Sequence, residues 1–143
     1  MALREIGPAL GACARVVRAA TVAPRTEAGL ALVEAPPLLA RDEPMSVRVR
    51  LVNPTRAECR LQVAVDGIAA DGRTFHVSWN AHLAPFAAED RYVVTTWRGD
   101  ATVEQTEPSL PHRWAVGVPA ATWRVIARVG SCPPLEVAGA WTS

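Results

Sequence analysis

The sequence contains no lysine, so all fifteen basic residues are arginines, against fourteen aspartates and glutamates. With a formal net charge of +1, the chain lacks the strong field that attracts nucleic acid or anionic membranes. It also lacks any apolar run near the roughly 20 residues that span a bilayer, so no membrane span is expected. The missing lysine, together with abundant Ala, Val, Pro and Gly, indicates a GC-rich bacterial coding sequence.

Cysteine is scarce, and Cys13, Cys59 and Cys132 show no CxxC spacing, which argues against a zinc knuckle or a thioredoxin-like motif. A disulfide between Cys59 and Cys132 remains open for an exported protein, and reduced thiols for a cytoplasmic one. LGAC at residues 10–13 resembles a lipoprotein cleavage site. The apolar stretch before it is shorter than the roughly 7–15 residues of a signal peptide. We therefore expect a cytoplasmic protein, or an exported one if a leader was removed.

Two hydrophobic periods divide the chain. In residues 1–22 apolar side chains recur at spacings of three and four, which predicts an amphipathic helix near residues 8–21. That helix would pack on its own domain or on a partner. Farther along, the period becomes two, the spacing of half-buried strands. We assign residues 1–25 to an N-terminal helix and linker, and residues 26–143 to a β-domain.

The β-domain shows six clear strand patterns and two weaker ones. The clear patterns cover residues 45–52, 59–66, 74–80, 91–97, 122–130 and 135–142, and the weaker ones cover residues 28–35 and 101–107. Turn residues separate these patterns, and no helical segments stand between them for parallel crossovers. The sequence therefore predicts an all-β fold, an antiparallel β-sandwich of about seven or eight strands with a short N-terminal helix.

Three stretches carry a family resemblance: MSVRVRLVNPTRAECRLQVAVDG, HLAPFAAEDRYVVTTW and ATWRVIARV. Together they resemble bacterial immunoglobulin-like modules of the CARDB and fibronectin type III-like kind, over residues 44–143. The chain departs from that pattern at Phe86, where a corner glycine is usual, and in its long 101–121 connection. The resemblance implies an immunoglobulin-like sandwich that serves as a spacer, an adhesion element or a subunit-docking domain.

The stretch RTFHVSWNAHLAPF, residues 73–86, holds His76 and His82. On a continuous strand the two imidazoles would lie about 20 Å apart, too far to bind one ion. We expect His76 on the solvent face and His82 in a corner that turns at Pro85. No metal, cofactor or catalytic residue is therefore expected, and no nucleophile elbow is present. The alternative is a small enzyme, or a ligand- or metal-binding protein, with a pocket of His76, His82 and Tyr92.

Arginine and tryptophan side chains are the main candidates for partner binding. The candidates on outward strand positions are Arg48, Arg50, Arg124 and Arg128. They form one basic face if their strands are neighbours, or else they pair with Asp66, Glu136 and Glu58. Four further candidates lie at a strand end or in the long connection: Trp97, His112, Arg113 and Trp114. The two tryptophans are either exposed anchors or packed side chains. We expect a non-catalytic interaction or accessory module whose partner is another protein, with a homo-oligomer as one form.

Replacing Trp114 by alanine is expected to weaken partner binding and to leave the midpoint of thermal unfolding nearly unchanged, because an exposed anchor contributes to binding rather than to the core. A binding assay and a thermal melt of the same variant measure the two effects. A large loss of stability would instead place Trp114 in the core.

Overall fold

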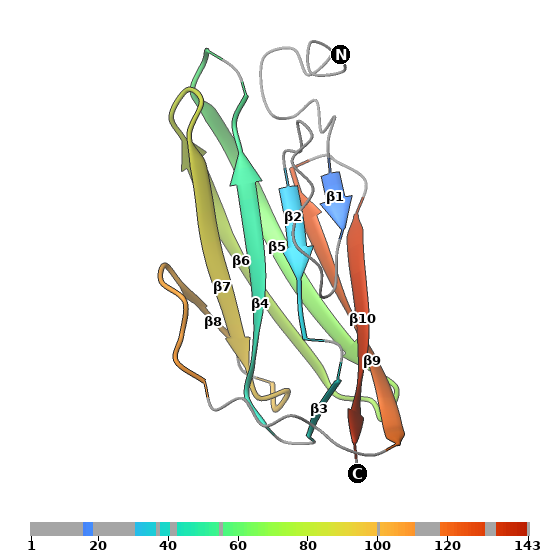
Figure 1. The fold of residues 1–143 in the computed structure, drawn as a ribbon. Helices are drawn as coiled ribbons and strands as arrows, with labels where there is room; N and C mark the ends of the chain where they lie inside the picture. The colour runs from blue at the N-terminus through green and yellow to red at the C-terminus, as the bar shows by residue number, and fades with distance from the viewer. Residues whose placement is uncertain are drawn as a thin grey trace.

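Two five-stranded β-sheets form the computed structural model of this protein (Figure 1). The structure describes residues 16–18, 31–36, 38–40, 43–54, 56–99, 101–110, 118–130 and 134–142. Every regular element within these ranges is a β-strand. Over the same ranges, no helix is long and apolar enough to cross a membrane. The predicted all-β class is confirmed.

The first sheet has the strand order β1-β2-β4-β7-β8. Its strands are β1 (Val16–Arg18), β2 (Ala31–Glu34), β4 (Met45–Val52), β7 (Ala88–Thr95) and β8 (Ala101–Glu104). The second sheet has the order β3-β10-β9-β5-β6. Its strands are β3 (Leu38–Ala40), β10 (Leu135–Thr142), β9 (Pro119–Val129), β5 (Cys59–Ala69) and β6 (Thr74–Leu83). Neighbouring strands run antiparallel, except that β1 pairs with β2, and β3 with β10, in parallel.

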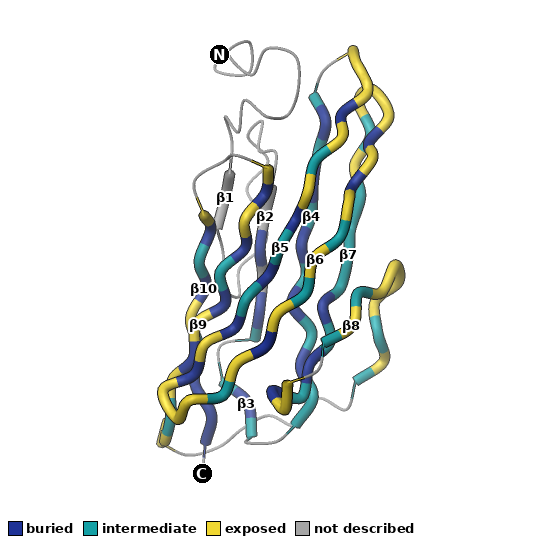
Figure 2. Tube along the Cα trace, turned by 180° about the vertical axis from the view of Figure 1, so that it is seen from behind, coloured by how far each residue is buried: buried dark blue, intermediate teal, exposed yellow. Residues whose placement is uncertain are grey.

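Burial alternates along the strands, as the period-two pattern predicts (Figure 2). Along β4, Val47, Val49 and Leu51 are buried while the residues between them are only half-buried. Inward residues of both sheets form one hydrophobic core. All eight predicted strands are present, including the two weaker ones at β2 and β8. The three-residue strands β1 and β3 were not predicted as strands, because so short a segment shows no period.

The predicted helix near residues 8–21 is wrong at Val16–Arg18, which form strand β1. Backbone pairing aligns Val16 with Ala31 and Arg18 with Val33 of β2. The remainder of the predicted helix lies outside the described residues. A spacing of three and four over a short run of small side chains is a weak signal, and pairing with a neighbouring strand overrides it.

Trp97 lies in the core, 1% exposed, and not on the surface. Its ring centroid lies 4.8 Å from that of Phe75, 5.3 Å from that of Trp141 and 5.9 Å from that of Trp123. These three aromatic residues belong to the second sheet. On the other side, Trp97 Nε1 donates a hydrogen bond to Met45 Sδ of β4 over 2.9 Å. The prediction of Trp97 as a partner-binding anchor is therefore wrong, and the packed alternative is confirmed.

Two glycines make room for this aromatic cluster. A Cβ atom at Gly67 would lie 2.1 Å from the Phe75 ring and 2.6 Å from the Trp97 ring. A Cβ atom at Gly139 would lie 2.2 Å from the Trp123 ring. Both distances are far below van der Waals contact, so only glycine allows the rings to pack directly on the backbones of β5 and β10.

The corner between β6 and β7 is anchored by Asn53, which is 0% exposed. Its side-chain Nδ2 donates hydrogen bonds to the carbonyls of Ala57 over 2.8 Å, Ala84 over 3.0 Å and Leu83 over 3.3 Å. Its backbone N–H donates to Ala87 over 2.9 Å. Asn53 therefore joins the end of β4 to the corner that follows β6, and so helps to position β6 at the edge of the second sheet.

The Trp97→Ala variant is expected to lose about 3–5 kcal/mol of unfolding free energy, because it empties a large volume between the two sheets. The matched control is Trp79→Ala, which removes an indole that only partly packs against the core. Urea unfolding followed by circular dichroism measures both losses. A Trp97→Ala loss no larger than that of the control would contradict a central packing role for Trp97.

Candidate binding surface on the second sheet

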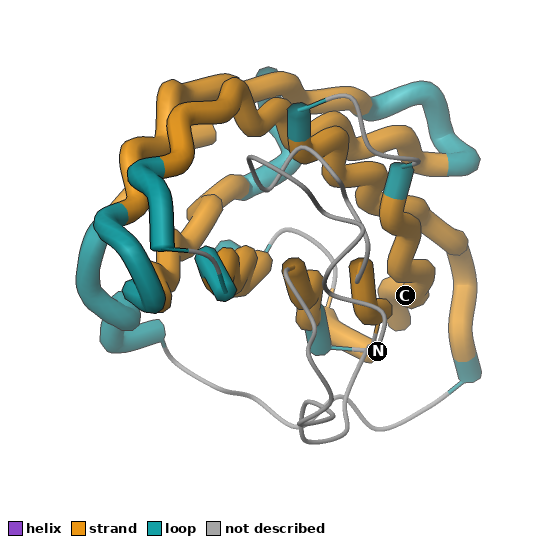
Figure 3. The backbone as a smooth tube through the Cα atoms, turned by 90° about the horizontal axis from the view of Figure 1, so that it is seen from above, coloured by secondary structure: helices purple, strands orange, loops and turns teal. Residues whose placement is uncertain are grey.

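The four predicted arginines do not form one face. Arg48 and Arg50 lie on β4 of the first sheet, whereas Arg124 and Arg128 lie on β9 of the second. The two sheets pack around a shared core, seen end-on in Figure 3, so their outer faces point away from each other. Strands β4 and β9 are not neighbours, so the four arginines do not share one face.

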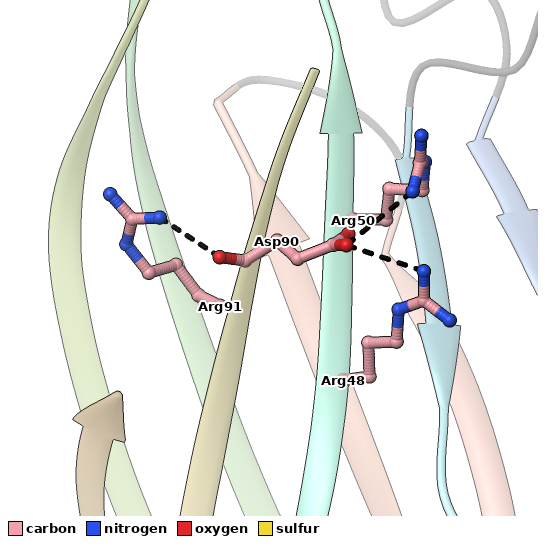
Figure 4. A network of polar contacts seen from close by, with 4 residues as sticks. All are labelled: Arg48, Arg50, Asp90 and Arg91. Atoms are coloured by element: carbon pink, nitrogen blue, oxygen red, sulfur yellow. Dashed lines mark hydrogen bonds and ion pairs between the residues drawn. The ribbon is translucent and has the colours of Figure 1, made fainter. Parts of the chain in front are cut away.

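On the first sheet, one carboxylate binds both arginines. Asp90 Oδ2 lies 3.3 Å from Arg48 Nη2 and 3.4 Å from Arg50 Nη1 (Figure 4). Arg91, the next residue on β7, donates to the Asp90 backbone carbonyl over 2.9 Å and to Glu89 Oε1 over 2.9 Å. Asp90 therefore joins both arginines of β4 to strand β7.

On the second sheet, the alternative of internal ion pairs is confirmed for both arginines. Arg124 Nη1 lies 3.4 Å from Glu136 Oε1, and Arg128 Nη1 lies 2.9 Å from Asp66 Oδ2. The arginine side chains are about half exposed, so each pair contributes at most about 1 kcal/mol to stability. Their position on an open face makes them available to a partner as well.

Asp66 joins three neighbouring strands. Its Oδ2 atom accepts from Arg128 of β9, and its Oδ1 atom lies 2.5 Å from His76 Nδ1 of β6. The cross-strand pairing of Asp66 with His76 brings the second contact about. We call these three residues the Asp66 network. Its carboxylate orients the imidazole, and His76 Nε2 has no hydrogen-bond partner among the residues that the structure describes.

A hollow of about 510 Å³ lies beside the Asp66 network. Its apolar lining includes Ile68 and Ile126, and Thr74 and Gly99 border it. Ile68 is 41% exposed, and Ile126 is half-buried on the outer face beside Asp66. The second sheet therefore presents a small apolar centre with charged side chains around it.

The two strand histidines do not converge. Strand β6 continues through Leu83, so His82 lies on the strand and not in the corner, which corrects its predicted position. The chain turns after it, at Pro85 and Phe86. His82 Nε2 lies 2.5 Å from Glu58 Oε2, while His76 contacts Asp66. Six residues of strand separate the imidazoles by about 20 Å.

The alternative pocket of His76, His82 and Tyr92 does not form. Tyr92 pairs with Arg48 on the first sheet, and the histidines lie on the outer face of the second. Among the described residues, no group of three or more His, Cys, Asp or Glu side chains could hold a metal ion. His112, Arg113 and Trp114 lie outside the described residues, so their predicted role stays a prediction.

Neither a family model nor a curated protein matches this chain. The candidate binding surface is therefore identified from its geometry alone. The sequence pointed to Arg124 and Arg128, and missed Ile68 and Ile126. Their signal was available: both are large apolar residues at outward positions of β5 and β9, where the other outward residues are polar or small.

Because His76 and His82 bind separate carboxylates, they are not expected to share a zinc ion, so the wild-type protein and the His82→Ala variant are expected to have the same zinc content. Elemental analysis after dialysis against zinc measures both proteins, with His76→Ala as the matched control. One tightly bound zinc per chain, lost in the His82→Ala variant, would contradict this geometry.

Proposed function

We propose that residues 26–143 form an immunoglobulin-like, non-catalytic interaction module, a docking domain or subunit of a bacterial protein complex. The strand order supports the fold assignment. Immunoglobulin sandwiches join strands A, B and E in one sheet and strands C, F and G in the other. Here β4 and β7 take the places of B and E, and β5, β9 and β10 those of C, F and G. Strand β6 then corresponds to C′.

The first immunoglobulin strand is divided between the sheets. Strand β2 pairs with β4 in the first sheet, and β3 pairs with β10 in the second. Strand β8 departs from the pattern, because it follows β7 in the chain and pairs with its outer edge. The resemblance in sequence and the order of the remaining strands therefore support the same assignment.

The observation that carries a binding function is the outer face of β5, β6 and β9. Ile68 and Ile126 form its apolar centre, and the Asp66 network and Arg124 surround them. Protein interfaces have this composition, with an apolar core and a polar rim in which arginine is enriched. We assign this face to a protein partner, with His112, Arg113 and Trp114 as further predicted contributors. Arg48 and Arg50 lie on the opposite face and would contact a different surface.

Binding fits this face better than catalysis. His76 is oriented by Asp66 as a catalytic base would be, but its side chain is 63% exposed. Preorganised catalytic charges act most strongly where water is excluded. Ser78, the next outward residue on β6, makes no hydrogen bond to His76. The Asp66 network is therefore proposed to recognise a partner rather than to activate a nucleophile.

Placing a charge in the apolar centre tests the proposal. Ile68→Glu and Ile126→Glu are expected to reduce recovery of a bound protein by roughly tenfold or more, the effect of losing about 1.4 kcal/mol of binding free energy. Quantitative affinity purification from the source cells measures recovery. Val118→Glu is the control, because Val118 is an 81% exposed apolar residue that does not line the hollow.

Unfolding midpoints of the three variants check that each remains folded. Recovery that survives both isoleucine changes but is lost in Arg48→Glu would move the partner surface to the first sheet. Recovery unchanged in all of these variants would overturn the proposed role of both faces.

A further inference from the structure

The second sheet ends in an unusually long edge strand. Among the strands that the structure describes, four lie at sheet edges, namely β1, β8, β3 and β6. Three of them contain only three or four residues, whereas β6 contains ten. Edge strands expose unpaired backbone groups, and short length is one of the means by which proteins protect them from pairing with other chains. Strand β6 lacks that protection.

The hydrogen-bond phase shows which backbone groups of β6 are unpaired. Ala69 N donates to Arg73 O over 2.9 Å at the β5–β6 turn. Gly130 N donates to Gln62 O over 2.8 Å on the other side of β5. Odd-numbered residues of β5 therefore bond to β6, and even-numbered residues bond to β9. It follows that the backbone groups of even-numbered β6 residues point away from β5.

The β6 residues whose backbone N–H and C=O groups point away from β5 are Thr74, His76, Ser78, Asn80 and His82. We call these five the outward residues of β6. No described residue forms a backbone hydrogen bond to them from beyond the edge. Strands β7 and β8 approach β6 from the first sheet without pairing with it (Figure 2). The pairing of β5 with β6 shows no register shift from Ile68 to Cys59, and β6 contains neither proline nor lysine. The edge therefore has no bulge and none of the residues that usually block strand addition.

We propose that β6 pairs antiparallel with β6 of a second copy of this chain, with the two-fold axis at Ser78. In this register Ser78 lies opposite its own counterpart, His76 opposite Asn80 of the second copy, and Thr74 opposite His82 of the second copy. All five outward residues then exchange N–H···O bonds in both directions. The second sheets of the two copies become one continuous sheet.

The side chains of β6 are self-complementary in the same register. Val77 and Trp79 are only partly buried against the core of their own chain. In the proposed dimer Val77 lies opposite Trp79 of the second copy, and Trp79 opposite Val77, at positions where side chains approach most closely. Pairs of an aromatic and a β-branched residue stabilise antiparallel strands.

Charge favours a second copy over a strongly charged peptide. No like charges face each other across the proposed pair, and each chain has a net charge of only +1, so the copies repel each other weakly. The interface uses the edge of the second sheet and not the apolar centre of its outer face. It therefore does not depend on the proposed partner surface around Ile68.

The two-fold register gives a specific test at Ser78. Ser78→Lys and Ser78→Asp each place like charges opposite one another, and each is expected to raise the dimer dissociation constant roughly tenfold or more. An equimolar mixture of the two variants places opposite charges at the axis and is expected to restore the dimer. Sedimentation velocity measures all three samples, and circular dichroism checks that each variant folds.

Ser46→Lys is the matched control, because it makes the same change on β4 of the first sheet, and it is expected to leave the dimer intact. A wild-type chain that remains monomeric at high micromolar concentration would overturn the proposal. A dimer that persists in Ser78→Lys, or a mixture of charge variants that stays monomeric, would also overturn it. Because Ile68→Glu leaves β6 unchanged, it is expected to dimerise normally, which separates this test from the test of the partner surface.

Discussion

The packing of Trp97 between the two sheets is the contact on which the rest of the structure depends. Its indole contacts three aromatic rings of the second sheet and donates a hydrogen bond to Met45 of the first. Its backbone adopts a φ of +63°, which is unfavourable for a bulky residue and persists only where surrounding contacts compensate. Glycines at 67 and 139 remove the Cβ atoms that would displace the rings. A strained backbone and two specialised glycines thus serve one packing arrangement.

The inward side chains of both sheets pack in this core, so contacts with other molecules fall to the outward side chains. The division of the strands between the two sheets decides which outward side chains lie close to one another. Asp66, His76 and Arg128 come from three strands that are distant in sequence but adjacent in the second sheet. Arg48 and Arg50 belong to the other layer and contact Asp90. The same division leaves β6 as an edge, so the outer face and the edge of one sheet can serve two different contacts.

The strand predictions succeeded where the burial of a residue follows from its place in an alternating pattern. Alternation in MSVRVRLV matches the burial along β4 residue by residue, because a strand directs successive side chains to opposite faces. Trp97 also follows this rule, since it is buried in phase with Val93 and Thr95 although it lies just beyond the end of β7. Its place at a strand end, and not alternation, made it a candidate anchor. His82 was assigned to a corner because a sequence pattern locates the end of a strand poorly when polar side chains continue on the outer face.

The sequence by itself determined the all-β class, the approximate strands, and which side chains face the solvent, since each follows from local periodicity. Only the tertiary structure decided which strands are neighbours, and with them the separation of the four arginines, the joining of His76 to Arg128 through Asp66, and the position of β6 at the edge of its sheet. Pairing depends on contacts between residues far apart in the chain. Local periodicity carries no information about them, because the same alternating pattern suits either sheet.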